Sequence, residues 1–154
     1  MQSNTFYNEV LTDHNIHPSH KYKMENPTFS LEGVNPSCGD DIVLFLKVSD
    51  ADVIEDASFD GDGCAISQAS ADMMCDLIIG KKKEEALRLS EIFLRMIKGR
   101  ISDAEKEELE EAGILEDIAH MPARVKCAVL GWHTMDEIFK DADEGKVGQA
   151  KDPD

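Results

Sequence analysis

Short runs of hydrophobic residues in the first third of the chain predict β-strands. Residues 41–48 (DIVLFLKV) are rich in Ile, Val and Phe, and weaker runs cover 28–34 and 53–59. The loops between these runs are short, which favours an antiparallel meander over parallel strands joined by crossovers. A helix precedes them, because Ser3 can cap a segment that extends to about Asp13. The first part of the chain therefore predicts one helix followed by three antiparallel strands.

Helical spacing of hydrophobic residues dominates the rest of the chain. One helix is expected over 66–79 and another over 84–98, each followed by a glycine that favours a helix end. Residues 102–111 begin with Ser and carry Glu three positions later, a capping box for a short acidic helix. Pro122 starts a last long helix. Strands first and helices later predict an α+β fold, a small antiparallel three-stranded sheet with helices packed on one face.

Length and composition indicate a single domain. The chain has 154 residues, of which 42% are hydrophobic, enough for one sizeable core. We expect this domain to cover 1–140 and the charged, Gly-bearing segment 141–154 to be a frayed tail. No apolar run approaches the length of a membrane span. Residues 1–10 have neither the basic nor the apolar region of a secretory signal, so a cytoplasmic location is expected.

The charge of the chain limits its partners. The sequence has 32 acidic and 16 basic residues, a net charge of −16. Nucleic acid is not an expected partner, because binding phosphates needs clustered Lys and Arg. The simpler interpretation of this charge is a solvated, self-repelling surface. The alternative is a field that steers the protein toward a basic partner.

Three of the four cysteines lie where the local sequence predicts the end of an element. Cys38 and Asp40 flank Gly39 in a turn that Pro36 also favours, so their side chains can converge. Cys64 follows a Gly-rich turn and begins a helix. In a reducing compartment, cysteines spaced in this way indicate metal or redox chemistry rather than disulfides.

The other two cysteines differ in their surroundings. Cys127 lies near the start of the last helix, beside Arg124 and Lys126, and the helix dipole is expected to favour its thiolate, as it does for Cys64. Three thiolates and the Asp40 carboxylate would complete a tetrahedral zinc site. Buried or incidental cysteines explain the same pattern equally well. The fourth cysteine, at position 75, lies among hydrophobic residues of one helix and is predicted to be a core residue.

Three motifs resemble those of a known family. In order they are Asn35-Pro-Ser-Cys-Gly-Asp40, Gly61-Asp-Gly-Cys-Ala-Ile-Ser-Gln-Ala-Ser70, and Arg124-Val-Lys-Cys127 followed by Trp132. They resemble the U-type iron–sulfur cluster assembly proteins, which include the IscU scaffolds and the N-terminal part of NifU. The resemblance extends from about Phe6 to Phe139 and implies the SufE/IscU-like form of the α+β fold.

Two departures from the scaffold pattern resemble the SufU branch of the family. Lys126 occupies the position where IscU scaffolds have His, and the stretch between Cys64 and Cys127 is long. The resemblance then implies a zinc-dependent sulfurtransferase that accepts persulfide sulfur from a SufS-type cysteine desulfurase. It further implies that downstream cluster-assembly proteins are partners. The implied zinc ligands are Cys38, Asp40, Cys64 and Cys127, and the implied sulfur acceptor is Cys38.

Two alternatives to sulfur transfer remain open at this stage. Thiolates also suit a [2Fe–2S] cluster, so the same residues would serve a scaffold that builds a cluster and passes it to apo-proteins. Lys126 is evidence against the scaffold, since an ammonium group is a poor ligand. A zinc ion with a purely structural role is the other alternative. For sulfur transfer, Cys38 must leave its metal, and its turn flanked by Pro and Gly favours that movement.

Overall fold

The computed structural model describes residues 2–143, with side chains described from Glu9 to Ala142. The remaining part of the predicted tail, 144–154, lies outside the described residues. In chain order the elements are α1 (Gln2–Ile16), β1 (Phe29–Asn35), β2 (Asp40–Val48), β3 (Ile54–Asp62), α2 (Ala65–Ile78), α3 (Lys83–Ile97), α4 (Asp103–Glu108), the 3₁₀ helix η1 (Glu110–His120) and α5 (Pro122–Asp143). The sheet has the order β1-β2-β3 and both pairs are antiparallel, so the predicted α+β fold is confirmed.

The register of the sheet separates a core face from an outer face. Leu31 pairs with Leu44, which pairs with Phe59, and all three side chains are buried. Because neighbouring residues of a strand point to opposite faces, the next row, which contains Ser30 and Phe45, lies on the other face. Asn35, the last residue of β1, pairs with Asp40, the first residue of β2, on the same face as the core row. The Asp40 side chain therefore points toward the helices.

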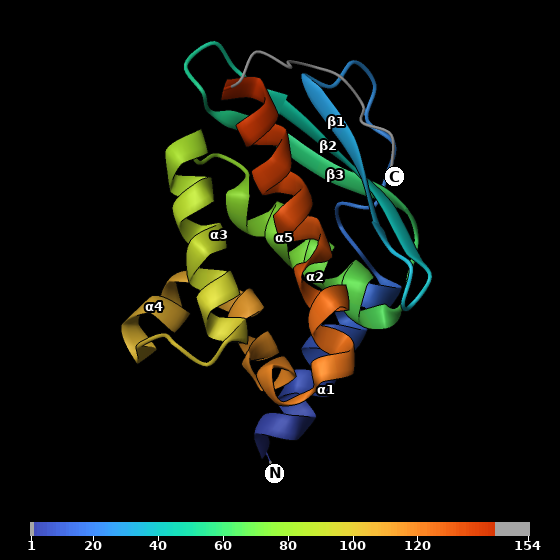
Figure 1. The fold of residues 1–154 in the computed structure, drawn as a ribbon, viewed down its shortest axis with the longest axis vertical. Coiled ribbons are helices and arrows are strands. Elements are labelled where there is room, and N and C mark those ends of the chain that lie inside the picture. Colours follow the sequence, from blue (N-terminus) through green and yellow to red (C-terminus); the bar gives the residue numbers. More distant parts are fainter. Residues whose placement is uncertain (1, 144–154) are drawn as a thin grey trace.

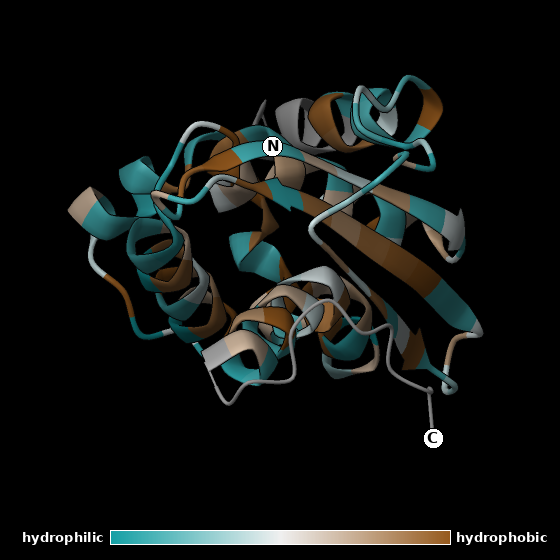
Figure 2. Cartoon of the chain, turned by 90° about the horizontal axis from the view of Figure 1, so that it is seen from above, coloured by the Kyte–Doolittle hydropathy of each residue, from teal (hydrophilic) through white to brown (hydrophobic). Residues whose placement is uncertain are grey.

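The helices form a layer against the core face. Figure 1 shows α5 between the sheet and α3, with α1 and α4 in the lower part of the view. Trp132 of α5 is completely buried and stacks on Phe93 of α3, with ring centroids 4.1 Å apart. Its indole N–H donates to Ser70 Oγ of α2 at 3.0 Å. Figure 2 shows hydrophobic stretches in the strands and on the helices beside them, with hydrophilic residues prominent in the loops.

Most element boundaries agree with the sequence, and the first helix is one exception. It continues to Ile16, beyond the predicted end near Asp13, and Ser3 lies inside it rather than at its N-cap. The capping box of α4 is confirmed, because Ser102 Oγ accepts the Glu105 N–H and the Glu105 side chain accepts the Ser102 N–H.

The 3₁₀ helix η1 was not predicted. It begins at Glu110, which has a positive φ of 53°, two residues after α4 ends at Glu108. Its buried side chains are spaced by three residues, the period of a 3₁₀ helix rather than of an α-helix; they include Ala112, Leu115 and Ile118. In the part of the chain from 2 to 143, no helix is both long and apolar enough to cross a membrane.

Candidate metal centre

The turn between β1 and β2 carries the first two predicted ligands. Asn35 and Asp40 face each other across the hairpin, and the Cys38 N–H donates to the Asn35 carbonyl at 3.3 Å. Gly39 has φ of +73°, a left-handed conformation that glycine adopts without steric cost. Cys38 is exposed at this turn, whereas Asp40 is completely buried.

Hydrogen bonds hold the Asp40 carboxylate at both oxygens. Its Oδ1 accepts the Cys64 backbone N–H at 2.8 Å and lies 3.1 Å from the hydroxyl of Ser67. Its Oδ2 accepts from Asn35 Nδ2 at 3.1 Å. The carboxylate thus ties the hairpin turn to the N-terminus of α2, and its direction is fixed before any metal binds.

Cys64 is the N-cap of α2. Its Sγ accepts the backbone N–H of Ser67 at 3.4 Å, so the sulfur takes the place of the usual capping oxygen. The preceding Gly63 passes close to the site: a Cβ there would collide with Ser67 Oγ and approach Asp40 Oδ1. A glycine is therefore required for the loop to bring Cys64 beside the carboxylate.

Cys127 enters the site from α5. This helix begins at Pro122, and five residues later the Cys127 side chain is completely buried. Its Sγ accepts from Asn35 Nδ2 at 3.6 Å. The neighbouring Lys126 is exposed, as expected for successive residues of a helix that has one face in the core.

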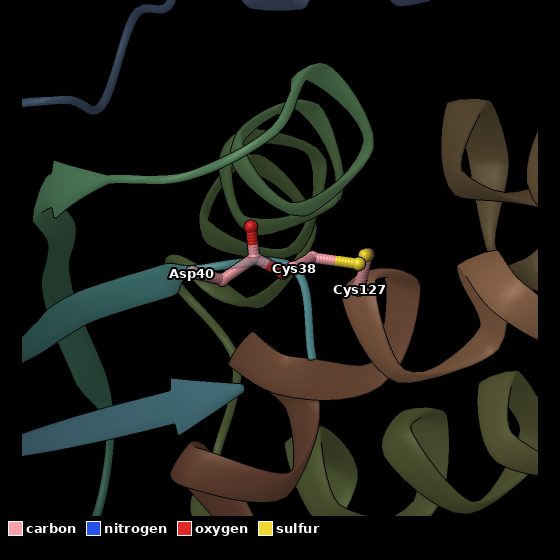
Figure 3. Close-up of side chains that lie close together, drawn as sticks. All are labelled: Cys38, Asp40 and Cys127. Carbon is pink, nitrogen blue, oxygen red and sulfur yellow. The ribbon is translucent and has the colours of Figure 1, made fainter. Parts of the chain in front are cut away.

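Three of the four predicted ligands come together around one point. Ligand atoms of Cys38, Asp40 and Cys127 all lie within 4.8 Å of one another, and Figure 3 shows the two sulfur atoms next to each other with the carboxylate beside them. Cys64 is not in this group, although it contributes to the raised pKa of Cys127. Its sulfur is directed to the N-terminus of α2 instead. Whether Cys64 is the fourth ligand stays a prediction.

The pKa values of Asp40 and Cys127 are shifted in opposite directions. Burial alone would raise the pKa of Asp40, but its hydrogen bonds, led by the one from the Cys64 backbone, hold that pKa below its ordinary value. Burial raises the pKa of Cys127 far above its ordinary value, and hydrogen bonds with the neighbouring thiols and with Asp40 raise it further. The prediction that the helix dipole favours the Cys127 thiolate is therefore wrong for the metal-free chain, because loss of solvent outweighs the dipole.

The donor set fits a zinc ion. Zn–S bonds of about 2.3 Å and Zn–O bonds of about 2.1 Å place tetrahedral ligand atoms roughly 3.6 Å apart. The three observed ligand atoms all lie within 4.8 Å of one another, close to that spacing. A divalent cation at this point would favour the ionised form of the buried Cys127 thiol as well as that of Asp40. Cys64 would need to turn from its capping position to complete the tetrahedron.

The remaining cysteine and the histidines lie elsewhere. Cys75 is completely buried in α2, which confirms its predicted core position. His14 Nδ1 lies 2.6 Å from Asp72 Oδ2 and its Nε2 lies 2.5 Å from Glu111 Oε1, so both ring nitrogens are engaged away from the cysteines. His20 pairs with Asp76 at 3.2 Å. None of these histidines belongs to the candidate metal group.

Two residues of the site, Asn35 and Ser67, were not predicted from the sequence. Each donates to Asp40 and to the sulfur of a cysteine, Asn35 through its amide and Ser67 partly through its backbone. A signal for Asn35 existed: it is placed five positions before Asp40, symmetrically across a predicted hairpin. Its contact with Cys127 depends on the packing of α5 and has no counterpart in local sequence.

A three-stranded sheet with helices on one face and a Cys–Asp–Cys group at its rim defines a U-type assembly domain. The sequence matches the NifU-like N terminal domain family over residues 6–144, and the chain belongs to that family.

Particular relatives have two different names. The chain is 44% identical over 137 residues to the iron–sulfur cluster assembly scaffold protein IscU of Streptococcus pyogenes, covering 89% of this chain and 84% of that protein. It is 41% identical over 133 residues to the zinc-dependent sulfurtransferase SufU of Bacillus subtilis, covering 86% and 88%. A crystal structure of a putative cluster assembly scaffold protein for the SUF system from Fervidobacterium islandicum superposes with a TM-score of 0.79 at 38% identity, covering 88% and 97%.

Proposed function

We propose that this protein is a cytoplasmic, zinc-dependent sulfurtransferase of iron–sulfur cluster assembly, and that Cys38 accepts sulfur from the persulfide of a SufS-type cysteine desulfurase. The observation that carries the proposal is the contrast between an exposed Cys38 and two ligands with which it converges, Asp40 and Cys127, both fully buried. One sulfur can be reached by a partner while the other groups stay in place. The relative named a zinc-dependent sulfurtransferase supports the same assignment.

The transfer itself is an exchange at sulfur without net oxidation. The Cys38 thiolate attacks the outer sulfur of the desulfurase persulfide, and a new S–S bond forms at Cys38. The S–S bond of the donor breaks, and its electron pair leaves with the donor cysteine as a thiolate, which takes the proton of the persulfide. The extra sulfur then resides on Cys38 and is passed to downstream cluster-assembly proteins.

The turn around Cys38 supports the movement that this exchange requires. A sulfur bound to a metal is a weaker nucleophile than a free thiolate, so Cys38 has to leave the site to react. Gly39 is left-handed and a Cβ there would meet nothing within 4 Å, so the turn has space. The Cys38 thiol donates to the Ala123 carbonyl at the long distance of 3.9 Å. Cys64 and Cys127 are instead held at helix ends.

Zinc would supply positive charge that keeps its cysteine ligands deprotonated near neutral pH. The residues that would hold it are Asp40, Cys64 and Cys127, with Cys38 as the ligand that is released. This division of roles explains why a buried Cys127, whose pKa is raised by burial in the metal-free chain, belongs in a sulfur-handling site.

The test is to incubate the zinc-loaded protein with desulfurase and cysteine and to locate persulfide by mass spectrometry. We expect the additional sulfur on Cys38, and a Cys38→Ala protein that folds normally but takes up none. A matched control is Cys75→Ala, which removes a thiol from the core and should leave sulfur uptake on Cys38. Persulfide found only on Cys64 or Cys127 would contradict the proposal. A Cys38→Ala protein with undiminished uptake would do the same.

A scaffold function is the second candidate, and the relative named a scaffold protein supports it. In that case the cluster is cargo, built on the same cysteines and then passed to apo-proteins. Lys126 is exposed and its ammonium group is a poor ligand, which favours sulfur transfer over the scaffold. Anaerobic reconstitution with iron and sulfide separates the two: a stable, stoichiometric chromophore would support the scaffold, and its absence together with persulfide on Cys38 would support sulfur transfer.

A further inference from the structure

Asn35 is a buried polar residue at the centre of the candidate metal centre. It is the last residue of β1, it faces the helices, and only 5% of it is exposed. A buried amide must be hydrogen-bonded to offset its desolvation. Its partners therefore identify what it does in the fold.

Those partners are the groups expected to bind metal. Asn35 Nδ2 donates to Asp40 Oδ2 at 3.1 Å and to Cys127 Sγ at 3.6 Å. Its backbone carbonyl accepts the N–H of Cys38 at 3.3 Å. An amide NH₂ group carries two hydrogens and no charge, so one side chain can serve a carboxylate and a thiolate at once.

The three cysteine sulfurs of the site differ in their hydrogen bonds. Cys127 Sγ accepts from Asn35, and Cys64 Sγ accepts from the Ser67 backbone at 3.4 Å. At Cys38 the polarity is reversed, because its thiol donates to the Ala123 carbonyl. An N–H donor withdraws electron density from a thiolate and tunes a metal bound to it. Hydrogen bonding thus distinguishes Cys127, whose sulfur accepts from a buried amide, from Cys38, whose sulfur is presented at the turn.

We propose that Asn35 is a positioning residue that holds Asp40 and Cys127 in place as permanent metal ligands while Cys38 is free to move. The proposal rests on the proposed function for its reason: transfer from Cys38 requires the other ligands to stay. Since the hydrogen bond between Asn35 and Cys38 joins their backbones, the Cys38 side chain can leave without breaking either side-chain bond of Asn35. The metal centre would then remain assembled during sulfur transfer.

Two substitutions at this position separate hydrogen bonding from packing. Asn35→Ala removes the amide and leaves space, whereas Asn35→Leu keeps similar volume without a donor. We expect each to weaken zinc binding by about 10- to 100-fold, the usual effect of losing a hydrogen-bond partner of a metal ligand. The affinity is measured by competition with a chromophoric chelator, with no desulfurase present.

A spectroscopic signature distinguishes positioning from simple stability. With cobalt(II) in place of zinc, the sulfur-to-metal charge-transfer band should move to lower energy in both Asn35 variants, because a sulfur without its N–H donor gives up an electron more easily. The matched control is Ser70→Ala. Ser70 Oγ donates to the Ala128 carbonyl at 2.6 Å and accepts from Trp132, so neither of these hydrogen-bond partners is a sulfur. It should lower the Tm and leave zinc affinity and the cobalt band near the wild type.

The outcomes separate this proposal from the function on which it rests. Wild-type zinc affinity and an unshifted cobalt band in either Asn35 variant would overturn the role of Asn35, even if Cys38 still takes up sulfur. A loss of affinity in Ser70→Ala as large as that in Asn35→Ala would also overturn it, since fold stability would then explain both. If affinity falls and the band shifts in the Asn35 variants while wild-type Cys38 takes up no sulfur, Asn35 keeps its role and the sulfurtransferase function fails.

Discussion

Two glycines beside the metal centre show how single residues set its geometry. Gly39 and Gly61 both have positive φ, at +73° and +123°. A Cβ on Gly39 would meet nothing within 4 Å, whereas one on Gly61 would collide with the Asp41 carbonyl oxygen and approach Ile42. The first glycine is needed only for its backbone conformation. The second is needed for conformation and for the close pairing of β2 with β3.

We therefore expect unequal effects of alanine at these positions. Gly39→Ala should lower the free energy of unfolding by about 1 kcal/mol, the cost of a left-handed alanine. Gly61→Ala should cost about 3 kcal/mol, because strain and the backbone collision add. Urea unfolding of the metal-free proteins measures both. Gly39→Asn is the control, with a smaller loss than Gly39→Ala because Asn tolerates this conformation better. Equal losses at the two positions would contradict the explanation.

Single residues also show which parts of the site could be predicted from the sequence. Cys38 and Asp40 were predicted to converge because Pro36 and Gly39 determine the local turn, and the structure brings them together with Cys127. The capping role of the Cys64 sulfur was not predicted. Cysteine is not among the residue types preferred at helix N-caps, so the local sequence gives no signal that its sulfur accepts the Ser67 N–H. The burial that raises the pKa of Cys127 is likewise a property of the packed helix layer.

At the scale of elements, regular periodicity was predictable and irregular connections were not. The strands and the helices α2, α3 and α5 follow from strand runs and from apolar side chains at α-helical spacing. The 3₁₀ helix η1 has three-residue spacing and starts at a residue with positive φ, Glu110, so neither signal resembles an α-helix. The helix η1 packs against α2, α3 and α5, and it also contacts α1 through His14.

His14 links α1 to two other elements. Its ring lies between the buried Asp72 of α2 and the exposed Glu111 of η1. The hydrogen bond to Asp72 raises the pKa of His14 to about 9, against the opposing effect of burial, and Glu111 adds to the rise. Asp72 also accepts the His20 backbone N–H at 2.8 Å, so its carboxylate is held in place for His14.

This link predicts that the docking of α1 depends on pH. The pKa of His14 is raised from 6.5 to about 9 on folding, so its contribution is fully present below pH 6.5 and is lost as the pH rises through about 9. One pKa unit corresponds to about 1.4 kcal/mol; with Glu111 exposed to solvent, we expect about 2 kcal/mol. Urea unfolding should show that His14→Gln destabilises the protein at about pH 6 and much less at about pH 10. The exposed His120→Gln is the control, and a loss independent of pH would exclude the ionic link.

At the scale of the whole molecule, the metal centre joins parts that are far apart in sequence. Its predicted ligands come from the β1–β2 turn, from the start of α2 and from α5. These three segments meet where the β1–β2 turn approaches the N-terminal parts of α2 and α5. The chain also carries a net charge of −16, which opposes compaction. A divalent cation at this rim would act as a cross-link between the sheet and the helix layer, and would offset part of the negative charge.

Removal of zinc should therefore destabilise the entire domain rather than one loop. At a free zinc concentration about 100 times the dissociation constant, binding to the folded state alone contributes about 2.7 kcal/mol, which corresponds to a rise in Tm of roughly 5–10 °C for a domain of this size. Calorimetry of the zinc-loaded and chelated proteins measures that shift. Magnesium is the control and should give no shift in Tm, because it prefers oxygen ligands to thiolates.

Cys38→Ala should retain part of the zinc-dependent shift in Tm, since Asp40, Cys64 and Cys127 would still bind zinc. Cys127→Ala should lose most of it, because it removes the ligand that belongs to α5. Equal shifts in the wild type and in Cys127→Ala would mean that zinc binds elsewhere and that these segments are not joined by a metal.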